Sequence, residues 1–180
     1  MEKPQHLYVR EKESHYTATI NGKTYTCAVG RNGFIAATDK KEGDGSTPTG
    51  TFPLRRLFYR DDIYKKSDLE TLLPKHALKP SDGWCDEPQH FDYNKRVDLL
   101  TFDLTISHEK LWRDDDVYHM IIEVGYNDDP VVPFKGSAIF IHIAREGYTG
   151  TAGCVAFSEG DLREIIAYLS PDSSVVIQGG

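Results

Sequence analysis

The chain of 180 residues contains no uninterrupted apolar run that approaches the roughly 20 residues needed to cross a bilayer, so we expect no membrane span. Positive charge is also scarce. The 21 lysine and arginine residues stand against 28 aspartate and glutamate residues, which gives a net charge of −7. Surfaces that bind nucleic acid normally show a clustered basic patch. We therefore predict no nucleic-acid partner.

Cysteine is rare as well. Cys27, Cys85 and Cys154 are an odd number of thiols and show no C-x-x-C spacing. A disulfide framework or a structural zinc site is therefore not expected, and a single functional thiol becomes a candidate. The histidines show no paired-ligand spacing, and no glycine-rich phosphate-binding motif occurs, so we predict neither a metal nor a cofactor.

The N-terminal residues show no apolar stretch and no small-residue cleavage site of the kind that secretory signals carry. We therefore expect a cytoplasmic location, and a periplasmic one if a leader has been removed from the sequence. Hydrophobic residues make up 39% of the chain, which is enough for a packed core. At this length we predict a single domain over residues 1–180.

Segments rich in β-branched and aromatic residues alternate with turn signals, which predicts a mainly β fold with a minor α part. Asn21-Gly22 predicts a tight hairpin. Residues 39–50 are expected to form a loop, and Pro53 suggests a strand that starts there or lies at a sheet edge. The expected strands lie within 7–37 and at 51–59, 118–126, 137–143 and 175–177.

One helix is predicted over residues 162–169, where the apolar side chains share one face, with Ser158 as its N-terminal cap. Residues 61–98 form a long polar stretch with little periodicity, apart from a short helical signal near 67–73. An elaborated loop of this length inside a domain is often functional.

The most informative segment joins a histidine to a cysteine. His142 ends the apolar strand, a turn-prone stretch follows, and Cys154 comes directly after Gly153. A free thiol, with a pKa of about 8.5, is mostly protonated at pH 7, so a cysteine nucleophile needs a base such as imidazole. Because Gly153 has no β-carbon, the backbone here can approach a substrate closely. The N–H groups around Cys154 are then candidates for an oxyanion site. On the pattern alone, a cysteine after a glycine is more often a small buried residue than a nucleophile, and the histidine could equally belong to the core.

The pair resembles the active-site signature of the YkuD-type L,D-transpeptidases, in which a histidine ends a strand and Ser/Thr-x-Gly-Cys follows after a loop. Here that motif is Thr151-Ala-Gly-Cys154. Further segments resemble one branch of the family, in the same order, from about residue 20 to the C-terminus. They are Cys27–Gly33, Lys41–Gly50, Trp84-Cys-Asp86, Tyr93-Asn94, Glu109…Asp115…Tyr118, Tyr126-Asn127 and Gly136–Phe140.

This resemblance implies an L,D-transpeptidase-like β-sandwich whose cysteine loop opens onto a cleft. It also implies attack on the carbonyl at the L-centre of a diamino acid in a peptidoglycan stem peptide. D-alanine then leaves, and the thioester passes to an amine or to water. On this resemblance Cys154 is the nucleophile, His142 is the general base and acid, and the N–H groups of Gly153 and Cys154 form the oxyanion site.

The resemblance also suggests substrate contacts, because a peptide substrate needs polar and aromatic walls. The chain departs from many members at two places: Ala152 stands where they carry His, and Ala156 where they carry Arg or Asn. Only 11 residues separate His142 from Cys154, fewer than in many members. Arg145 is the candidate to replace the missing contacts. The substrate-binding candidates are Thr151, Tyr118, Asn127, Trp84 and Arg145.

Location selects between two reactions. A transpeptidase needs a polymeric amine acceptor outside the cytoplasmic membrane, whereas a cytoplasmic protein meets soluble muropeptides, with water as the acceptor. We therefore favour an L,D-carboxypeptidase, with an L,D-transpeptidase as the alternative. An inactive family member that binds wall peptides or a partner protein is a further alternative. Nothing in the sequence indicates an oligomeric state.

Overall fold

A computed structural model describes residues 4–179 of the chain, which form short strands, three single-turn 3₁₀ helices and one α-helix. The 3₁₀ helices are η1 (Lys66–Asp68), η2 (Asp116–Tyr118) and η3 (Glu146–Tyr148), and the α-helix is α1 (Glu159–Ile166). The strands are β1 (Leu7–Lys12), β2 (His15–Ile20), β3 (Lys23–Cys27), β4 (Phe34–Ala36), β5 (Thr47–Tyr59), β6 (Lys75–Ala77), β7 (Asp82–Cys85), β8 (Lys95–Asp98), β9 (His108–Lys110), β10 (Met120–Val124), β11 (Phe140–Ile143), β12 (Val155–Phe157) and β13 (Ser174–Gln178).

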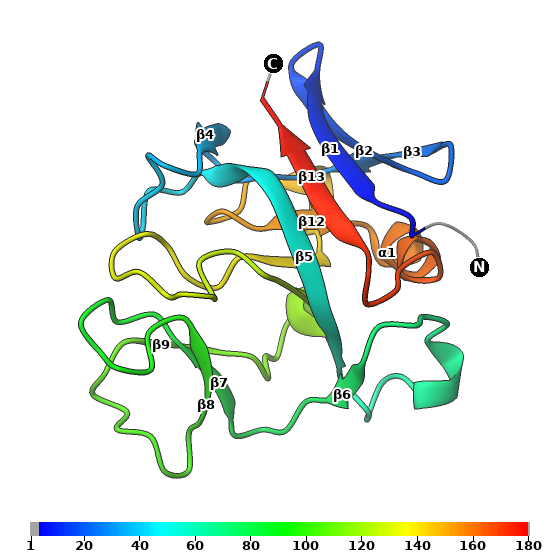
Figure 1. The fold of residues 1–180 in the computed structure, drawn as a ribbon. Helices are drawn as coiled ribbons and strands as arrows, with labels where there is room; N and C mark the ends of the chain where they lie inside the picture. The colour runs from blue at the N-terminus through cyan, green and yellow to red at the C-terminus, as the bar shows by residue number, and fades with distance from the viewer. Residues whose placement is uncertain (1–3, 180) are drawn as a thin grey trace.

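One large curled sheet forms the body of the protein (Figure 1). Its strands run in the order β12-β11-β10-β5-β13-β1-β2-β3, and β4 and β6 also pair with β5. The two ends of the sheet meet where Ala28, just after β3, exchanges backbone hydrogen bonds of 2.8 and 2.9 Å with Ala156 in β12. The sheet therefore closes around a core, and the mainly β prediction is confirmed.

The helix α1 packs into this core. Its residues Leu162, Ile165 and Ile166 are buried with the apolar side chains of the sheet. The hydroxyl of Ser158 accepts a hydrogen bond from the Asp161 N–H at 3.1 Å, which confirms the predicted cap. The helix ends before residue 169 because the bonds after Ile166 tighten to the i→i+3 pattern.

The two faces of β11 separate the core from the site. Successive side chains of a strand point to opposite faces. Ile141 and Ile143 therefore join the main core, whereas Phe140 belongs to a second apolar cluster that includes Cys154. His142 lies on the same face as Phe140, so local strand geometry brings the histidine and the cysteine to one side of the sheet.

The hairpin at Asn21-Gly22 is confirmed, with φ angles of 48° and 73° that match the expected turn. The prediction that Pro53 marks a sheet edge or a strand start is wrong, because β5 begins at Thr47 and lies between β10 and β13. Residues 50–53 pair with β13 and residues 54–59 with β10. Since the partner changes at this point, a missing N–H interrupts neither ladder.

The segment 61–98 is not one long loop. It contains the 3₁₀ turn η1, which overlaps the helical signal near 67–73 only at residues 67 and 68, because residues 69–73 are not helical. It also contains strand β6, which lies beside β5. Strands β7 and β8 join β9 in a separate three-stranded sheet (Figure 1). We call residues 82–110 the insertion lobe. Within residues 4–179 no helix is both long and apolar enough to span a membrane.

Candidate active site

A cleft of about 370 Å³ lies where the insertion lobe, the loop after β4 and the cysteine loop meet. Six of the eight predicted site residues line it, and two do not. Those that line it are Cys154, His142, Gly153, Thr151, Tyr118 and Arg145; those that do not are Trp84 and Asn127.

The Cys154 thiol is held against the start of β11. Its Sγ accepts a hydrogen bond from the Phe140 N–H at 3.4 Å and donates to the Ala138 carbonyl at 3.2 Å. Burial, and after it the carboxylate of Glu109, raises the pKa of this thiol to about 12, against smaller opposing effects of the Phe140 N–H and Lys40. The thiol is therefore protonated at neutral pH.

The His142 ring is fixed by a backbone carbonyl. Its Nδ1 lies 2.9 Å from the carbonyl oxygen of Ile143, which can only accept, so Nδ1 carries the proton and Nε2 keeps a lone pair. Burial lowers the pKa of His142 to about 4. The Tyr118 ring packs edge-on against it, with centroids 5.3 Å apart. The resting site thus contains a neutral thiol and a neutral imidazole.

Thr151 and Gly153 shape the cysteine loop. The Thr151 hydroxyl donates to the Cys154 carbonyl at 2.6 Å and accepts from the Gly153 N–H at 3.1 Å. Both polar functions of this hydroxyl are therefore used inside the loop, and one of the two expected oxyanion donors already has an acceptor. Residue 153 has a φ of +145°, and a Cβ there would lie 2.9 Å from the Ser46 carbonyl oxygen. Close backbone packing against Ser46 therefore requires glycine at this position.

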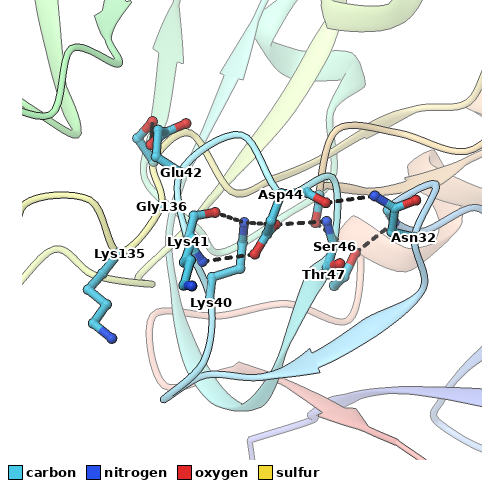
Figure 2. A network of polar contacts seen from close by, with 12 residues as sticks. Asn32, Lys40, Lys41, Glu42, Asp44, Ser46, Thr47, Lys135 and Gly136 are labelled. Carbon is cyan, nitrogen blue, oxygen red and sulfur yellow. Dashed lines mark hydrogen bonds and ion pairs between the residues drawn. The ribbon is translucent and has the colours of Figure 1, made fainter.

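Polar contacts hold the glycine-rich loop from Lys40 to Thr47 (Figure 2). The Thr47 hydroxyl in turn donates a hydrogen bond to the Gly153 carbonyl and so joins this loop to the cysteine loop. The Asp44 carboxylate pairs with the Lys40 ammonium and accepts the N–H groups of Lys41 and Ser46 at 2.8 and 2.9 Å. Although burial raises the pKa of Asp44, these partners hold it below its usual value. The Lys40 side chain is only 3% exposed, so this ion pair lies largely out of water.

A second polar group forms the opposite wall. The Tyr118 hydroxyl donates to Glu109 Oε1 at 2.6 Å, and burial raises the pKa of Glu109. Arg113 binds Asp115 through two hydrogen bonds of 2.8 and 2.7 Å, and Arg145 reaches the same carboxylate at 3.4 Å. Arg145 is 56% exposed at the rim, where a substrate can reach it.

Trp84 and Asn127 support the cleft from outside it. The Trp84 ring packs edge-on against Phe140, and its Nε1 donates to Asn94 Oδ1 at 3.0 Å. The Asn127 side chain holds its own loop, with bonds of 2.8–3.0 Å to Val132 and Gly136. Neither side chain lines the cleft, and the contacts of both are with residues that surround it.

The buried Asn94 joins these parts. Its Oδ1 also accepts the Ala138 N–H at 3.0 Å, and its Nδ2 donates to the carbonyls of Tyr126 and Asn127. The carbonyl of Ala138 in turn accepts the Cys154 thiol. Asn94 thus connects the insertion lobe to the backbone that holds the thiol.

Several polar residues of the cleft were not predicted as site residues. They come from loops and from the insertion lobe, and some belong to segments that resemble the family, but spacing alone assigned them no role. These residues are Lys40, Glu42, Asp86, His108, Glu109, Arg113 and Ser137. Among residues 4–179, no group of three or more histidine, cysteine or acidic side chains is arranged to hold a metal ion.

The other two thiols lie away from the cleft. Cys27 is buried in the main core, and burial raises its pKa to about 12. Cys85 is fully buried in β7 and does not line the cleft. All three cysteines are free.

Residues 4–177 match the sequence model of the YkuD family, the L,D-transpeptidase catalytic domain. The chain belongs to this family. The resemblance drawn from the ordered motifs is therefore confirmed over nearly the whole chain, and the fold of this YkuD domain is L,D-transpeptidase-like. No curated protein sequence matches the chain.

Three solved structures are similar to this YkuD domain at low identity. L,D-transpeptidase 1 from Mycobacterium tuberculosis is 10% identical (TM-score 0.42), with 98% of this chain and 62% of that chain covered. An L,D-transpeptidase from Mycobacterium smegmatis is 10% identical (TM-score 0.43), with 97% of this chain and 59% of that chain covered. The helical cell shape determining protein Pgp2 from Campylobacter jejuni is 14% identical (TM-score 0.41; 98% and 49%). The domain thus spans 49–62% of the length of these proteins.

Proposed function

We propose that the protein is a cysteine acyl-transfer enzyme that acts on peptidoglycan stem peptides. One observation carries the proposal. His142 keeps its Nε2 lone pair because Nδ1–H is committed to the Ile143 carbonyl, and Cys154 lines the same cleft from the same face of the sheet. A thiol and an oriented neutral base are the two groups that nucleophilic acyl transfer needs.

The proposed reaction has two stages. Nε2 of His142 removes the thiol proton while Sγ of Cys154 attacks the carbonyl carbon at the L-centre of the diamino acid. The C–N bond to D-alanine then breaks, and His142 returns the proton to the leaving amine. In the second stage an acceptor attacks the thioester carbonyl while His142 takes the acceptor's proton; the acyl C–S bond then breaks, and His142 returns the proton to Sγ, which regenerates the thiol.

Burial keeps the two groups neutral before substrate binds, since the pKa of Cys154 is raised and that of His142 is lowered. Proton transfer therefore accompanies attack, in contrast to a preformed thiolate–imidazolium pair. The thiol must also leave its hydrogen bond to the Ala138 carbonyl to face a substrate. Of the two expected oxyanion donors, the Gly153 N–H already serves Thr151 Oγ1, so we assign the main role to the Cys154 N–H.

We propose water as the acceptor, which makes the enzyme an L,D-carboxypeptidase acting on muropeptides in the cytoplasm. The size of the cleft supports this choice. About 370 Å³ lies near the lower end of the roughly 300–1,000 Å³ found for small-molecule sites, so it suits one peptide end better than a donor and an acceptor stem together. Tyr118 and Arg145 are the proposed substrate contacts, and Thr151 acts by holding the loop.

Incubation with a disaccharide tetrapeptide, followed by mass spectrometry, tests the proposal. Loss of one alanine supports the carboxypeptidase, whereas a cross-linked dimer shows the alternative transpeptidase. The variants Cys154→Ala and His142→Gln should abolish either product. Cys85→Ala is the matched control, because it removes a thiol that does not line the cleft, and it should retain activity.

The remaining alternative, an inactive binding protein, predicts a different result. In that case the wild type and Cys154→Ala bind the tetrapeptide equally well and neither changes its mass. A slow reaction of Cys154 with a thiol alkylator at pH 7 does not decide the question, because a buried neutral thiol reacts slowly in both cases.

A further inference from the structure

Tyr93 and Asn94 of the insertion lobe lie outside the cleft, yet their side chains hold a segment that lines it. The Tyr93 hydroxyl accepts a hydrogen bond from the Gly136 N–H at 3.0 Å, and Asn94 Oδ1 accepts one from the Ala138 N–H at 3.0 Å. Residues 136–138 lead directly into β11, which contains His142. Two adjacent lobe residues therefore fix the backbone at the entrance to this strand.

The backbone of Ala138 needs such support. Its φ is +51°, a left-handed conformation that is unfavourable for a residue with a β-carbon. Conformations of this kind persist only where their surroundings fix them, and they occur preferentially at functional sites. Asn94 is suited to the task because its side chain is buried and its amide is hydrogen-bonded on both sides, so it cannot turn away.

The same part of the lobe supports both backbone groups that hold the Cys154 thiol. Sγ lies between the Ala138 carbonyl, at 3.2 Å, and the Phe140 N–H, at 3.4 Å. Asn94 binds the N–H of Ala138, and the Trp84 ring packs edge-on against Phe140, with centroids 5.0 Å apart. Trp84 Nε1 donates to Asn94 Oδ1 at 3.0 Å, which joins the two supports to each other.

We propose that Asn94 is a positioning residue of the acyl transfer, which acts through Ala138 on the thiol of Cys154. This inference rests on the proposed function. When Sγ gives its proton to His142, the hydrogen bond to the Ala138 carbonyl breaks, whereas the Phe140 N–H can still donate to the sulfur as negative charge develops. Asn94 keeps this backbone in place while the thiol turns towards the substrate. Without the amide, the strained segment relaxes and the N–H loses its alignment.

The test is Asn94→Gly, which removes the amide and still accepts the left-handed φ of +57° at this position. With the disaccharide tetrapeptide, kcat should fall at least about tenfold, because the reacting thiol is misplaced. KM should stay within about twofold, because Asn94 does not line the cleft. Alkylation of Cys154 by iodoacetamide should become about fivefold faster, because the Ala138 carbonyl no longer holds the thiol proton firmly. An unchanged alkylation rate or an unchanged kcat overturns the proposal.

Two controls separate positioning from a loss of folded structure. Cys85 is buried in the same lobe and should stay unmodified in Asn94→Gly, as mass spectrometry can show; its alkylation would mean that the lobe opens, which overturns the proposal. Val9→Ala removes buried apolar atoms from β1 in the main core and lowers stability without a contact to the site. It should change neither kcat nor the Cys154 rate, and the same pair of changes there also overturns the proposal.

A second variant decides the question if Asn94→Gly does not fold. Trp84→Phe keeps an aromatic ring against Phe140 and keeps the Asn94 amide, but it loses the Nε1–H that fixes that amide. The same two changes, of smaller size, support the proposal, and wild-type values overturn it. If the wild type releases no alanine, the proposed function fails. The alkylation rates of Cys154 and Cys85 then decide separately whether Asn94 positions the thiol.

Discussion

The hydroxyl of Thr47 donates a hydrogen bond of 2.8 Å to the carbonyl of Gly153 and accepts one of 2.8 Å from the Gly30 N–H. Thr47 is fully buried, so no water replaces either bond. This one side chain joins the start of β5 to the residue that precedes the proposed nucleophile.

Replacing Thr47 by valine keeps the shape and leaves two buried backbone groups without partners. We expect the free energy of unfolding to fall by about 1–3 kcal/mol, measured by urea denaturation. Thr47→Ser retains the hydroxyl and should lose clearly less. Equal losses in the two variants would show that the methyl group, and not the hydroxyl, supports the loop.

Gly153→Ala should damage the site by a different route. The φ of +145° disfavours any L side chain, and the new Cβ meets the Ser46 carbonyl oxygen at 2.9 Å. We expect a loss of at least about 2 kcal/mol in unfolding free energy, together with loss of acyl transfer. In Gly160→Ala, at the start of α1, the Cβ meets nothing within 4 Å, and stability should stay within about 1 kcal/mol of wild type. Similar results for the two glycines contradict the packing argument.

The buried His142 should make folding stability depend on pH. Its native pKa of about 4 lies below its ordinary value of 6.5, so between these values the unfolded chain binds more protons than the native one. Stability is therefore fully present above pH 6.5 and falls as the pH drops towards 4, by up to about 3 kcal/mol. Denaturation curves from pH 4 to 7 measure this slope. His142→Asn should remove this part of the slope, and an unchanged slope in that variant rejects the assignment.

The Cys154 thiol should lose its proton only at high pH. Because its pKa is raised to about 12, its alkylation rate should rise about tenfold per pH unit between pH 7 and 9 without a plateau. Rates with iodoacetamide, with mass spectrometry to assign the modified cysteine, test this. A plateau below pH 7 would reveal a preformed ion pair with His142 and would contradict proton transfer during attack.

The Lys40–Asp44 pair should matter more than the exposed ion pairs. Asp44→Asn leaves the Lys40 ammonium, 3% exposed, without a counter-charge, which costs about 3 kcal/mol or more when a buried pair is broken. Asp128→Asn is the control, because its partner Arg55 is 39% exposed and such pairs contribute below about 1 kcal/mol. Urea denaturation of both variants gives the comparison. Comparable losses refute the claim that burial makes the first pair important.

Local signals in the sequence located the centre of the site. The α1 cap, the Asn21-Gly22 turn and the spacing of His142 and Cys154 depend on neighbours within a few residues or on one pair of strands. The insertion lobe depends on pairing between strands that are far apart in the sequence. These strands have only three or four residues each, which is too few to show the alternation of apolar and polar residues that predicts a strand.

The same limit explains the residues that sequence analysis misplaced. Trp84 and Asn127 belong to motifs that resemble family segments near the cleft. Both lie near the cleft, but neither side chain lines it. Their supporting role is visible only in the structure, where Trp84 bonds to Asn94 and Asn127 bonds to its own loop. The sequence did not indicate Lys40 as a site residue. Its position in the cleft depends on burial in the Lys40–Thr47 loop, which packs on Gly153, more than a hundred residues away.

The order of strands in the large sheet has a consequence for how the protein is made. β13 lies between β1 and β5 (Figure 1), while the segment after β3, at the other end of the same group of strands, bonds to β12. The three-stranded meander β1–β3 therefore joins the body of the sheet only when β12 and β13, both much later in the sequence, have been made. The closed sheet therefore depends on pairing between segments far apart in the sequence, which slows folding, and loss of β13 would leave β1–β3 joined to the rest of the sheet only through Ala28 and its neighbours.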